Sequence, residues 1–127
     1  MSIKVGDKLP EAKFRVMSAE GPAWKTTDEV FKGKGIDTIA VTSVNDVFVM
    51  DAWQKQTAAS MVTFLADGNG DFAKAIDLTF DGSGNGLGTR SRRYSMLVDD
   101  GVVKKLNIEE APGKVEVSGG DALLKQL

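Results

Sequence analysis

The chain of 127 residues contains no cysteine and no histidine. Disulfides, zinc sites with thiolate or imidazole ligands, a nucleophilic cysteine and a histidine general base are therefore excluded. Most of the common catalytic arrangements depend on one of these two residue types and are therefore absent. The length and the hydrophobic content of 42% are typical of one soluble domain with a sizeable core. We expect a single domain over residues 1–127.

The charges are balanced and scattered. Sixteen Lys and Arg stand against eighteen Asp and Glu, for a net charge of -2. This distribution predicts no nucleic-acid partner and no anionic membrane partner. No segment approaches the roughly 18 apolar residues that span a bilayer, and residues 1–7 lack the apolar stretch of a secretory signal. A cytoplasmic location is the resulting expectation.

The N-terminal part predicts a hairpin followed by a short helix. Residues 14–17 and 23–26 read as strands around a polar turn with Gly and Pro at 18–22. Thr26 and Glu29 have the spacing of a capping box, and Gly33 is expected to stop the helix.

Residues 37–66 have the order of a βαβ unit. A run rich in β-branched residues at 37–44 precedes Asn45 and Asp46, which favour a helix start, and a helix is expected over 47–56. A second apolar run at 61–66 completes the unit. Its two strands should be parallel.

The remaining third predicts short elements. Asp71 is expected to cap a helix through Ile76, and the glycine-rich residues 81–88 to form a flexible loop. Strands at 93–98 and 102–108 flank an Asp-Gly pair, which is a strong hairpin signal. Residues 120–127 predict a C-terminal helix.

Neither acidic loop satisfies the calcium pattern. Residues 67–71 and 81–85 alternate oxygen-bearing side chains, but the twelfth position, which requires a bidentate Glu, is Leu78 in one and Arg92 in the other. The glycines at 82–88 fit no nucleotide-binding motif. We expect no metal and no cofactor.

Two groups of residues allow alternative interpretations. Arg90, Arg92 and Arg93 precede an apolar strand; composition favours a solvated strand entrance over an anion site. Phe48, Met50 and Trp53 lie at helical spacing, which favours core packing over a pocket or an interface.

Several segments occur in the order found in one known family. They are residues 3–10, 30–34, 43–49, 65–68, 93–101 and 125–127, and the most specific are Ser-Val-Asn-Asp-Val-Phe-Val and Arg-Tyr-Ser-Met. The chain resembles the type-5 peroxiredoxins of the redoxin group over nearly its whole length. Its C-terminal part is similar to the bacterial branch, which generally draws electrons from glutathione or glutaredoxin.

The resemblance implies a thioredoxin-like α/β fold and peroxide reduction by one cysteine in a Pro-x-x-x-Thr-x-x-Cys loop. Such a cysteine attacks peroxide as a thiolate and becomes a sulfenic acid. The Pro and Thr of the loop and a distant Arg support it. Only that Arg has a counterpart here, Arg93 in the matching Arg-Tyr-Ser-Met context.

The departure from the family is large. After Gly33 and Lys34 the family continues with an apolar strand, the cysteine loop and a helix, whereas this chain passes directly to residues 35–38. The difference amounts to roughly 30 residues, the scale of a βαβ crossover. Ser and Thr hydroxyls are weak nucleophiles without an adjacent base. We predict no thiol peroxidase activity.

The implied fold therefore lacks its central strand and the helix that follows. In the family that strand lies between those matching residues 39–44 and 94–98. The two exposed edges are expected either to close by an antiparallel ladder or to be completed by a partner chain. We expect a homodimer or higher oligomer, with Phe48 and Trp53 at the interface.

Three functions follow from these observations. The first is a peroxiredoxin-derived, catalytically inactive domain that survives as an oligomerising scaffold. The second is a glutathione- or glutaredoxin-dependent peroxidase, as the resemblance alone implies. The third is an interaction module that pairs with a full-length peroxiredoxin subunit.

Overall fold

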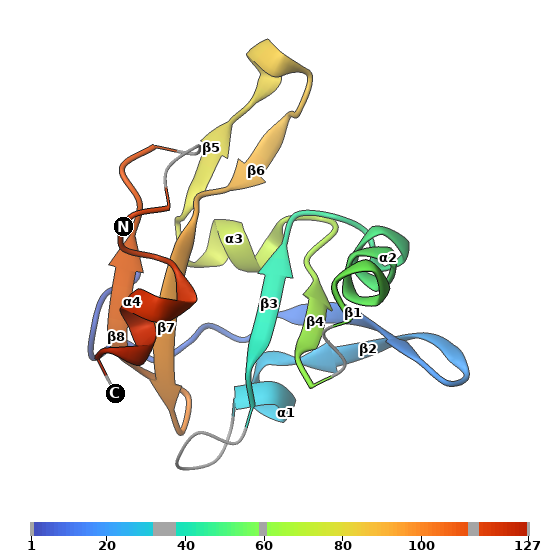
Figure 1. Cartoon of the computed structure of the whole chain (residues 1–127), viewed down its shortest axis with the longest axis horizontal. Helices are drawn as coiled ribbons and strands as arrows, with labels where there is room; N and C mark the ends of the chain where they lie inside the picture. The colour runs from blue at the N-terminus through green and yellow to red at the C-terminus, as the bar shows by residue number, and fades with distance from the viewer. Residues whose placement is uncertain (1, 32–37, 59–60, 112–114, 127) are drawn as a thin grey trace.

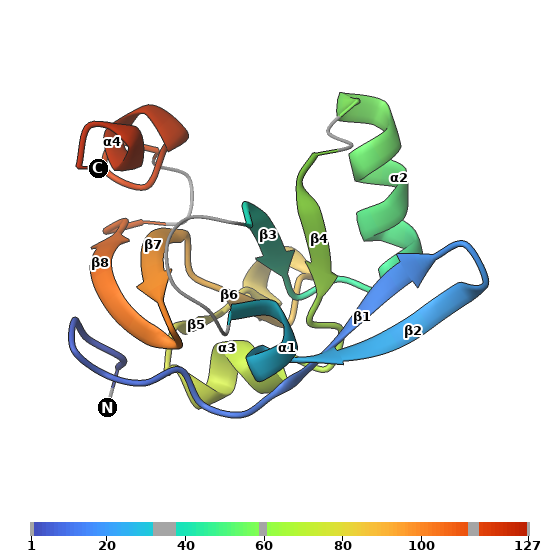
Figure 2. The ribbon, with the colours of Figure 1, turned by 90° about the horizontal axis from the view of Figure 1, so that it is seen from below.

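The computed structural model describes residues 2–31, 38–58, 61–111 and 115–126. These residues form three small sheets with short helices packed around them (Figure 1). In the view of Figure 2, α2 (Val47–Thr57) and α4 (Gly120–Leu124) lie on one side of the strands, and α1 (Thr27–Phe31) and α3 (Asp71–Ala75) on the other. None of the described helices has the length and hydropathy of a bilayer-spanning segment.

The N-terminal hairpin is confirmed. β1 (Lys13–Ser18) pairs antiparallel with β2 (Gly21–Thr26). The turn is tighter than predicted, because Gly21 adopts a φ of 108° that an L side chain disfavours. The capping box is also confirmed: the Glu29 amide donates to Thr26 Oγ1 at 3.3 Å, and the Thr26 amide donates to Glu29 Oε1 at 3.1 Å. Gly33, the expected helix stop, lies outside the described residues.

The βαβ unit is confirmed as well. β3 (Ala40–Ser43) and β4 (Thr63–Ala66) are parallel, with α2 between them in sequence. The Asp46 side chain caps α2 by accepting from the Val49 amide at 2.9 Å. β3 begins at Ala40, later than predicted, and residue 37 lies outside the described part. The sheet has the order β2-β1-β4-β3, so β3 is an edge strand.

The predicted cap of α3 is wrong. The N-cap position is Gly70, and the carboxylate of Asp67, not of Asp71, accepts hydrogen bonds from the Phe72 and Ala73 amides at 3.0 and 2.9 Å. Gly70 has a φ of 73°, and the turn that it makes brings Asp67 back over the helix start. Asp67 is thereby buried, with 3% of its surface exposed.

The glycine-rich segment is a hairpin and not a flexible loop. β5 (Thr79–Asp81) and β6 (Thr89–Ser91) pair antiparallel around a short 3-10 helix, η1 (Ser83–Asn85). A Cβ on Gly82 would lie 2.8 Å from the Leu87 Cβ. Glycine here therefore permits close packing of the two arms, which composition alone did not reveal.

The second predicted hairpin and the C-terminal helix are confirmed. β7 (Tyr94–Asp99) pairs antiparallel with β8 (Val102–Ile108), with a bulge between Leu97 and Val98. Asp100 and Gly101 form the turn with φ values of 52° and 80°, as expected for an Asp-Gly hairpin. α4 ends at Leu124 among the described residues.

The core has two parts. The larger lies between the sheets and α3 and includes Phe14, Leu65 and Phe72. The smaller lies under α2 and includes Met50. Of the three apolar residues at helical spacing, only Met50 is buried, at 1% exposed; Phe48 and Trp53 are 65% and 43% exposed. For these two the core interpretation is wrong.

The predicted closure of the two sheet edges is not made. β3 and β7 belong to different sheets, and no ladder joins them in the described part of the chain. The two strands run in opposite directions, with β7 beside β8 and β3 beside β4 (Figures 1 and 2). Residues of both strands instead line a common cavity, so the strands lie farther apart than the spacing of about 4.8 Å that a ladder requires.

Candidate functional site

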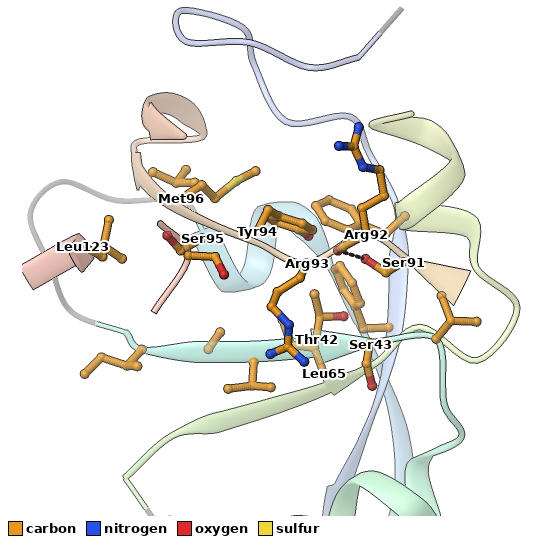
Figure 3. Close-up of a pocket in the computed structure, with 18 of the residues that line it drawn as sticks. Thr42, Ser43, Leu65, Ser91, Arg92, Arg93, Tyr94, Ser95, Met96 and Leu123 are labelled. Atoms are coloured by element: carbon orange, nitrogen blue, oxygen red, sulfur yellow. Dashed lines mark hydrogen bonds between the residues drawn. The ribbon is translucent and has the colours of Figure 1, made fainter. Parts of the chain in front are cut away.

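The opening between the two strands contains a cavity of about 890 Å³. Residues 38–45, including β3, form one wall, and residues 90–98, including β7, form the other (Figure 3). Buried side chains of the larger core, Phe14, Leu65 and Phe72, also line it. We call this cavity the β3–β7 slot.

The wall formed by β3 presents backbone groups that have no partner strand among the described residues. The carbonyls of Ile39 and Ser43 accept from β4 and the residue after it, at 2.8 and 3.0 Å. Because alternate residues of a strand bond to the same neighbour, the amides and carbonyls of Ala40 and Thr42 point the other way, into the slot. β3 therefore offers a sheet edge to the cavity.

The wall formed by β7 does the same. The Glu109 amide donates to the Arg93 carbonyl at 3.0 Å, which makes these two residues a hydrogen-bonded pair of the antiparallel ladder. By alternation, Ser95 bonds to β8, whereas Tyr94 and Met96 direct their amides and carbonyls away from β8 and into the slot. Two sheet edges thus face one cavity.

One side-chain oxygen in the β3 wall is also without a partner. Thr42 Oγ1 is buried and makes no hydrogen bond within the described residues. A buried hydroxyl that lacks a partner is destabilising. Thr42 lines the slot, so this hydroxyl is a polar group of the β3 wall that lacks a partner among the described residues.

The three arginines before β7 have different roles. Arg90 donates from Nη1 to the Val44 carbonyl at 2.7 Å and to Asn45 Oδ1 at 2.9 Å, and so ties β6 to the end of β3. Arg92 donates to the Glu109 carbonyl at 3.0 Å. Arg93 is exposed, and its guanidinium makes no hydrogen bond or ion pair in the part of the chain that the structure describes.

The Arg93 side chain points across the slot toward Thr42 and Ser43 (Figure 3). The interpretation of all three arginines as a solvated strand entrance therefore fails for Arg90 and Arg92, which bind backbone and side-chain oxygens. Arg90 and Arg92 also line the cavity, but their guanidinium groups already donate to oxygens of the chain, so Arg93 is the lining arginine whose side chain has no partner among the described residues. It can bind an anion there.

Tyr94 lies next to this cation on β7 and packs against the larger core. Burial raises the pKa of its hydroxyl well above the usual range, and the negative charge of Asp67 raises it further. Tyr94 therefore stays protonated at neutral pH. It contributes a neutral wall to the slot and no base.

The C-terminal segment is anchored over the slot by a residue that sequence reasoning missed. Glu109 is 3% exposed, and one of its oxygens accepts hydrogen bonds from the amides of Glu116, Val117 and Ser118 and from the Ser118 hydroxyl. Burial acts to raise the pKa of Glu109, but these hydrogen bonds outweigh it and lower the pKa below its usual value. The anchored segment leads into α4, whose Leu123 lines the slot.

The two expected interface residues lie differently. Trp53 lines the slot and packs edge-on against Phe64, with ring centroids 5.2 Å apart. Phe48 is exposed on α2 and does not line it. Among the described residues no cluster of three or more metal-ligating side chains is found. In the first acidic loop, Asp67 is occupied by helix amides.

Comparison with known proteins assigns the chain to a family. A family model described as Redoxin matches residues 16–124. The chain belongs to the redoxin family. Curated relatives of this redoxin include Peroxiredoxin-2F, mitochondrial, from Oryza sativa subsp. japonica, which is 40% identical over 94% of this chain, and Hybrid peroxiredoxin hyPrx5 from Haemophilus influenzae, which is 43% identical over 87%. The peroxiredoxin identity expected from the motifs is thus confirmed.

The redoxin spans only part of these relatives. It covers 61% of the rice protein and 46% of the Haemophilus protein. It covers 78% of Peroxisomal membrane associated protein 20 from Schizosaccharomyces pombe, at 42% identity. The relatives' names include mitochondrial and peroxisomal forms, so the cytoplasmic location of the redoxin stays a prediction.

Solved structures support the thioredoxin-like peroxiredoxin fold. The redoxin is similar to reduced Prx3 in complex with H2O2 from Vibrio vulnificus, with a TM-score of 0.91, 35% identity and coverage of 98% of both chains. It is also similar to a putative thioredoxin reductase from Burkholderia cenocepacia, with a TM-score of 0.93, 35% identity and coverage of 100% and 99%. The role of Arg93 in such a fold stays a prediction.

Proposed function

We propose that this redoxin is a peroxiredoxin-derived domain without thiol peroxidase activity, which acts by assembling with other polypeptide chains. One observation carries the proposal: Arg93 points into a slot bordered by two unpaired sheet edges, in a chain with no cysteine. The cation persists, whereas the thiolate that it would support has no counterpart.

The chemistry of the slot supports inactivity in the thiol reaction. Reduction of a peroxide by a peroxiredoxin needs a thiolate that attacks one peroxide oxygen and becomes a sulfenic acid. Arg93 can hold an anion but cannot donate an electron pair in this way. The hydroxyls of Thr42 and Ser95 are poor nucleophiles without a base, and the chain has no histidine to provide one.

The exposed edges support assembly. Unpaired strand edges next to apolar surface promote pairing with another chain. Trp53, which lines the slot and is 43% exposed, adds apolar surface at its border. Formation of a homodimer or higher oligomer would remove both the strand edges and the Trp53 side chain from water.

Two measurements test this function. In the first, purified protein is incubated with hydrogen peroxide, glutathione and glutaredoxin. We expect peroxide to be lost at the rate of a blank without the protein. Faster loss would establish the peroxidase alternative. Sedimentation velocity over a range of concentrations should give a mass above that of one 13.6 kDa chain. A monomer at every concentration would contradict the assembly role.

A second candidate partner is a complete peroxiredoxin subunit. It is favoured by the close match of this fold to a solved peroxiredoxin chain, with a TM-score of 0.91 over 98% of both chains. Mixing the chain with a full-length peroxiredoxin of the same organism and measuring mass by light scattering tests it. Separate species at all ratios would eliminate this candidate.

A further inference from the structure

We propose that the β3–β7 slot binds the extended carboxyl-terminal segment of another polypeptide, which runs parallel to β3 and antiparallel to β7 with its terminal carboxylate at Arg93. The inference rests on the proposed assembly function and specifies its partner. The segment is four to six residues long, the lengths of β3 and β7, and is apolar.

The backbone of the slot requires a strand as its occupant. Ala40 and Thr42 on one wall, and Tyr94 and Met96 on the other, direct amides and carbonyls into the same cavity. An extended peptide carries donors and acceptors on both of its edges at the same spacing, so it can satisfy both walls at once. A compact apolar molecule would fill the volume but leave these groups unpaired.

The lining of the slot determines the side chains of the segment. Phe14, Leu65 and Phe72 present a buried apolar surface along one face of the opening. Trp53 of α2 and Leu123 of α4 also line the slot. In Figure 2, α2 and α4 lie on the other side of the strands from α3, the helix that contains Phe72. Small β-branched residues suit such a doubly covered strand.

Charge determines the direction of the segment. Because β3 and β7 run in opposite directions, Arg93 at the start of β7 lies near Ser43 at the end of β3 (Figure 3). A carboxyl-terminal strand parallel to β3 brings its terminal carboxylate to this cation. The reverse direction would bring its amino end there, where like charges repel.

The test uses a synthetic peptide designed from these features. The probe is Lys-Gly-Thr-Val-Thr-Val-Thr-Val, with a fluorophore on the Lys side chain and a free carboxyl terminus. Binding to the full chain is measured by fluorescence anisotropy. Hydrogen exchange of the Thr42 and Met96 amides is followed with and without the peptide. We expect saturable binding and slower exchange at both amides.

Two modified peptides separate strand pairing from apolar filling. In one the three Val amides are N-methylated, and in the other the three Thr amides, so that each loses the donors on one edge only. We expect each to bind about tenfold or more weakly, because each loses hydrogen bonds to one wall. Equal binding of all three peptides would overturn the proposal in favour of an apolar ligand. If only one of the two N-methylated peptides binds more weakly, the peptide pairs with one wall only, which would overturn insertion between two strands.

A third peptide and two protein variants test the direction. Amidation of the carboxyl terminus should weaken binding about threefold, as expected for an exposed ion pair. Arg93→Gln should abolish the difference in affinity between the free-carboxyl peptide and the amidated peptide. Lys104→Gln, at an exposed position of β8 outside the slot, should retain that difference. Preference for the amidated peptide would overturn the assigned direction.

The failure of this inference is distinguishable from that of the proposed function. If no peptide binds but the chain oligomerises with Thr42 and Met96 protected, a second copy fills the slot, and only the peptide inference falls. If no peptide binds and the chain is monomeric, both fall. Peroxide turnover above the blank would contradict only the claim that the protein has no peroxidase activity.

Discussion

The carboxylate of Glu109 accepts two hydrogen bonds from Ser118, one from its amide and one from its hydroxyl, both at 2.6 Å. Glu109 directly follows β8, and Ser118 precedes α4. This pair fixes the C-terminal segment and keeps Leu123 at the border of the β3–β7 slot. A carboxylate that gathers backbone amides in this way acts as a clasp between two parts of the chain.

Glu109→Gln should release this clasp. The substitution removes the charge and replaces one acceptor oxygen with a donor, so the amides of Val117 and Ser118 lose a charge-assisted hydrogen bond. We expect faster hydrogen exchange at these amides and a lower free energy of unfolding. Glu110→Gln, on the exposed neighbouring residue, serves as the control. Unchanged exchange in Glu109→Gln would refute the clasp.

The same residue predicts a pH dependence. The pKa of Glu109 is lowered from 4.5 in the folded protein, so its contribution to stability is fully present above pH 4.5 and is lost as the pH falls through the lower folded value. Denaturant unfolding at a series of pH values should show a smaller loss between neutral and acidic pH in Glu109→Gln than in the unmodified chain. Parallel pH profiles would count against this assignment.

Asp67 and Asp71 provide a matched pair for the start of α3. Asp67→Ala removes the acceptor for the Phe72 and Ala73 amides and should cost about 1–2 kcal/mol of stability. Asp71→Ala, at an exposed position that accepts no hydrogen bond from the helix start, should change stability by less than about 0.5 kcal/mol. Chemical denaturation measures both. A larger loss of stability in Asp71→Ala than in Asp67→Ala would show that Asp71 caps the helix.

Tyr94 reports on the same carboxylate. It is the only tyrosine of the chain, so ultraviolet absorbance follows its ionisation without interference. Burial, and secondarily Asp67, hold its pKa above 10.0. We expect Asp67→Asn to lower the Tyr94 pKa while leaving it above that of free tyrosine. No change would show that the two groups do not interact.

Trp53 and Phe48 should differ in assembly. Both are exposed, but only Trp53 lines the slot. We expect Trp53→Ala to weaken self-association in sedimentation velocity, and Phe48→Ala to weaken it less. A larger effect of Phe48→Ala would place the interface on the outer face of α2 and away from the slot.

The sequence predicted the locally encoded elements. The capping box at Thr26 and Glu29, the Asp46 cap and the Asp-Gly turn at 100 and 101 each depend on residues only a few positions apart, and all are present. The glycine-rich hairpin was missed because its order depends on close packing of Gly82 against Leu87, which composition does not reveal.

The site was predicted only in part. Arg93 was identified through its motif, but the different partners of Arg90 and Arg92 depend on contacts with residues 17 to 46 positions away. The role of Glu109 was missed because its partners, the amides of residues 116–118, lie 7 to 9 positions farther along the chain, beyond the reach of a local motif. Closure of β3 against β7 was one of two expected arrangements, and it is not made among the described residues, because a cavity separates the two strands.

The central claim is that the β3–β7 slot is open in one chain and is filled by another. Backbone hydrogen exchange of Thr42 and Met96, compared with the ladder residues Val41 and Leu97, tests it most directly. At low concentration we expect fast exchange at the first two amides and slow exchange at the second two, with protection of all four as chains associate. Slow exchange of Thr42 and Met96 at every dilution would show that the slot closes on itself and would contradict the account.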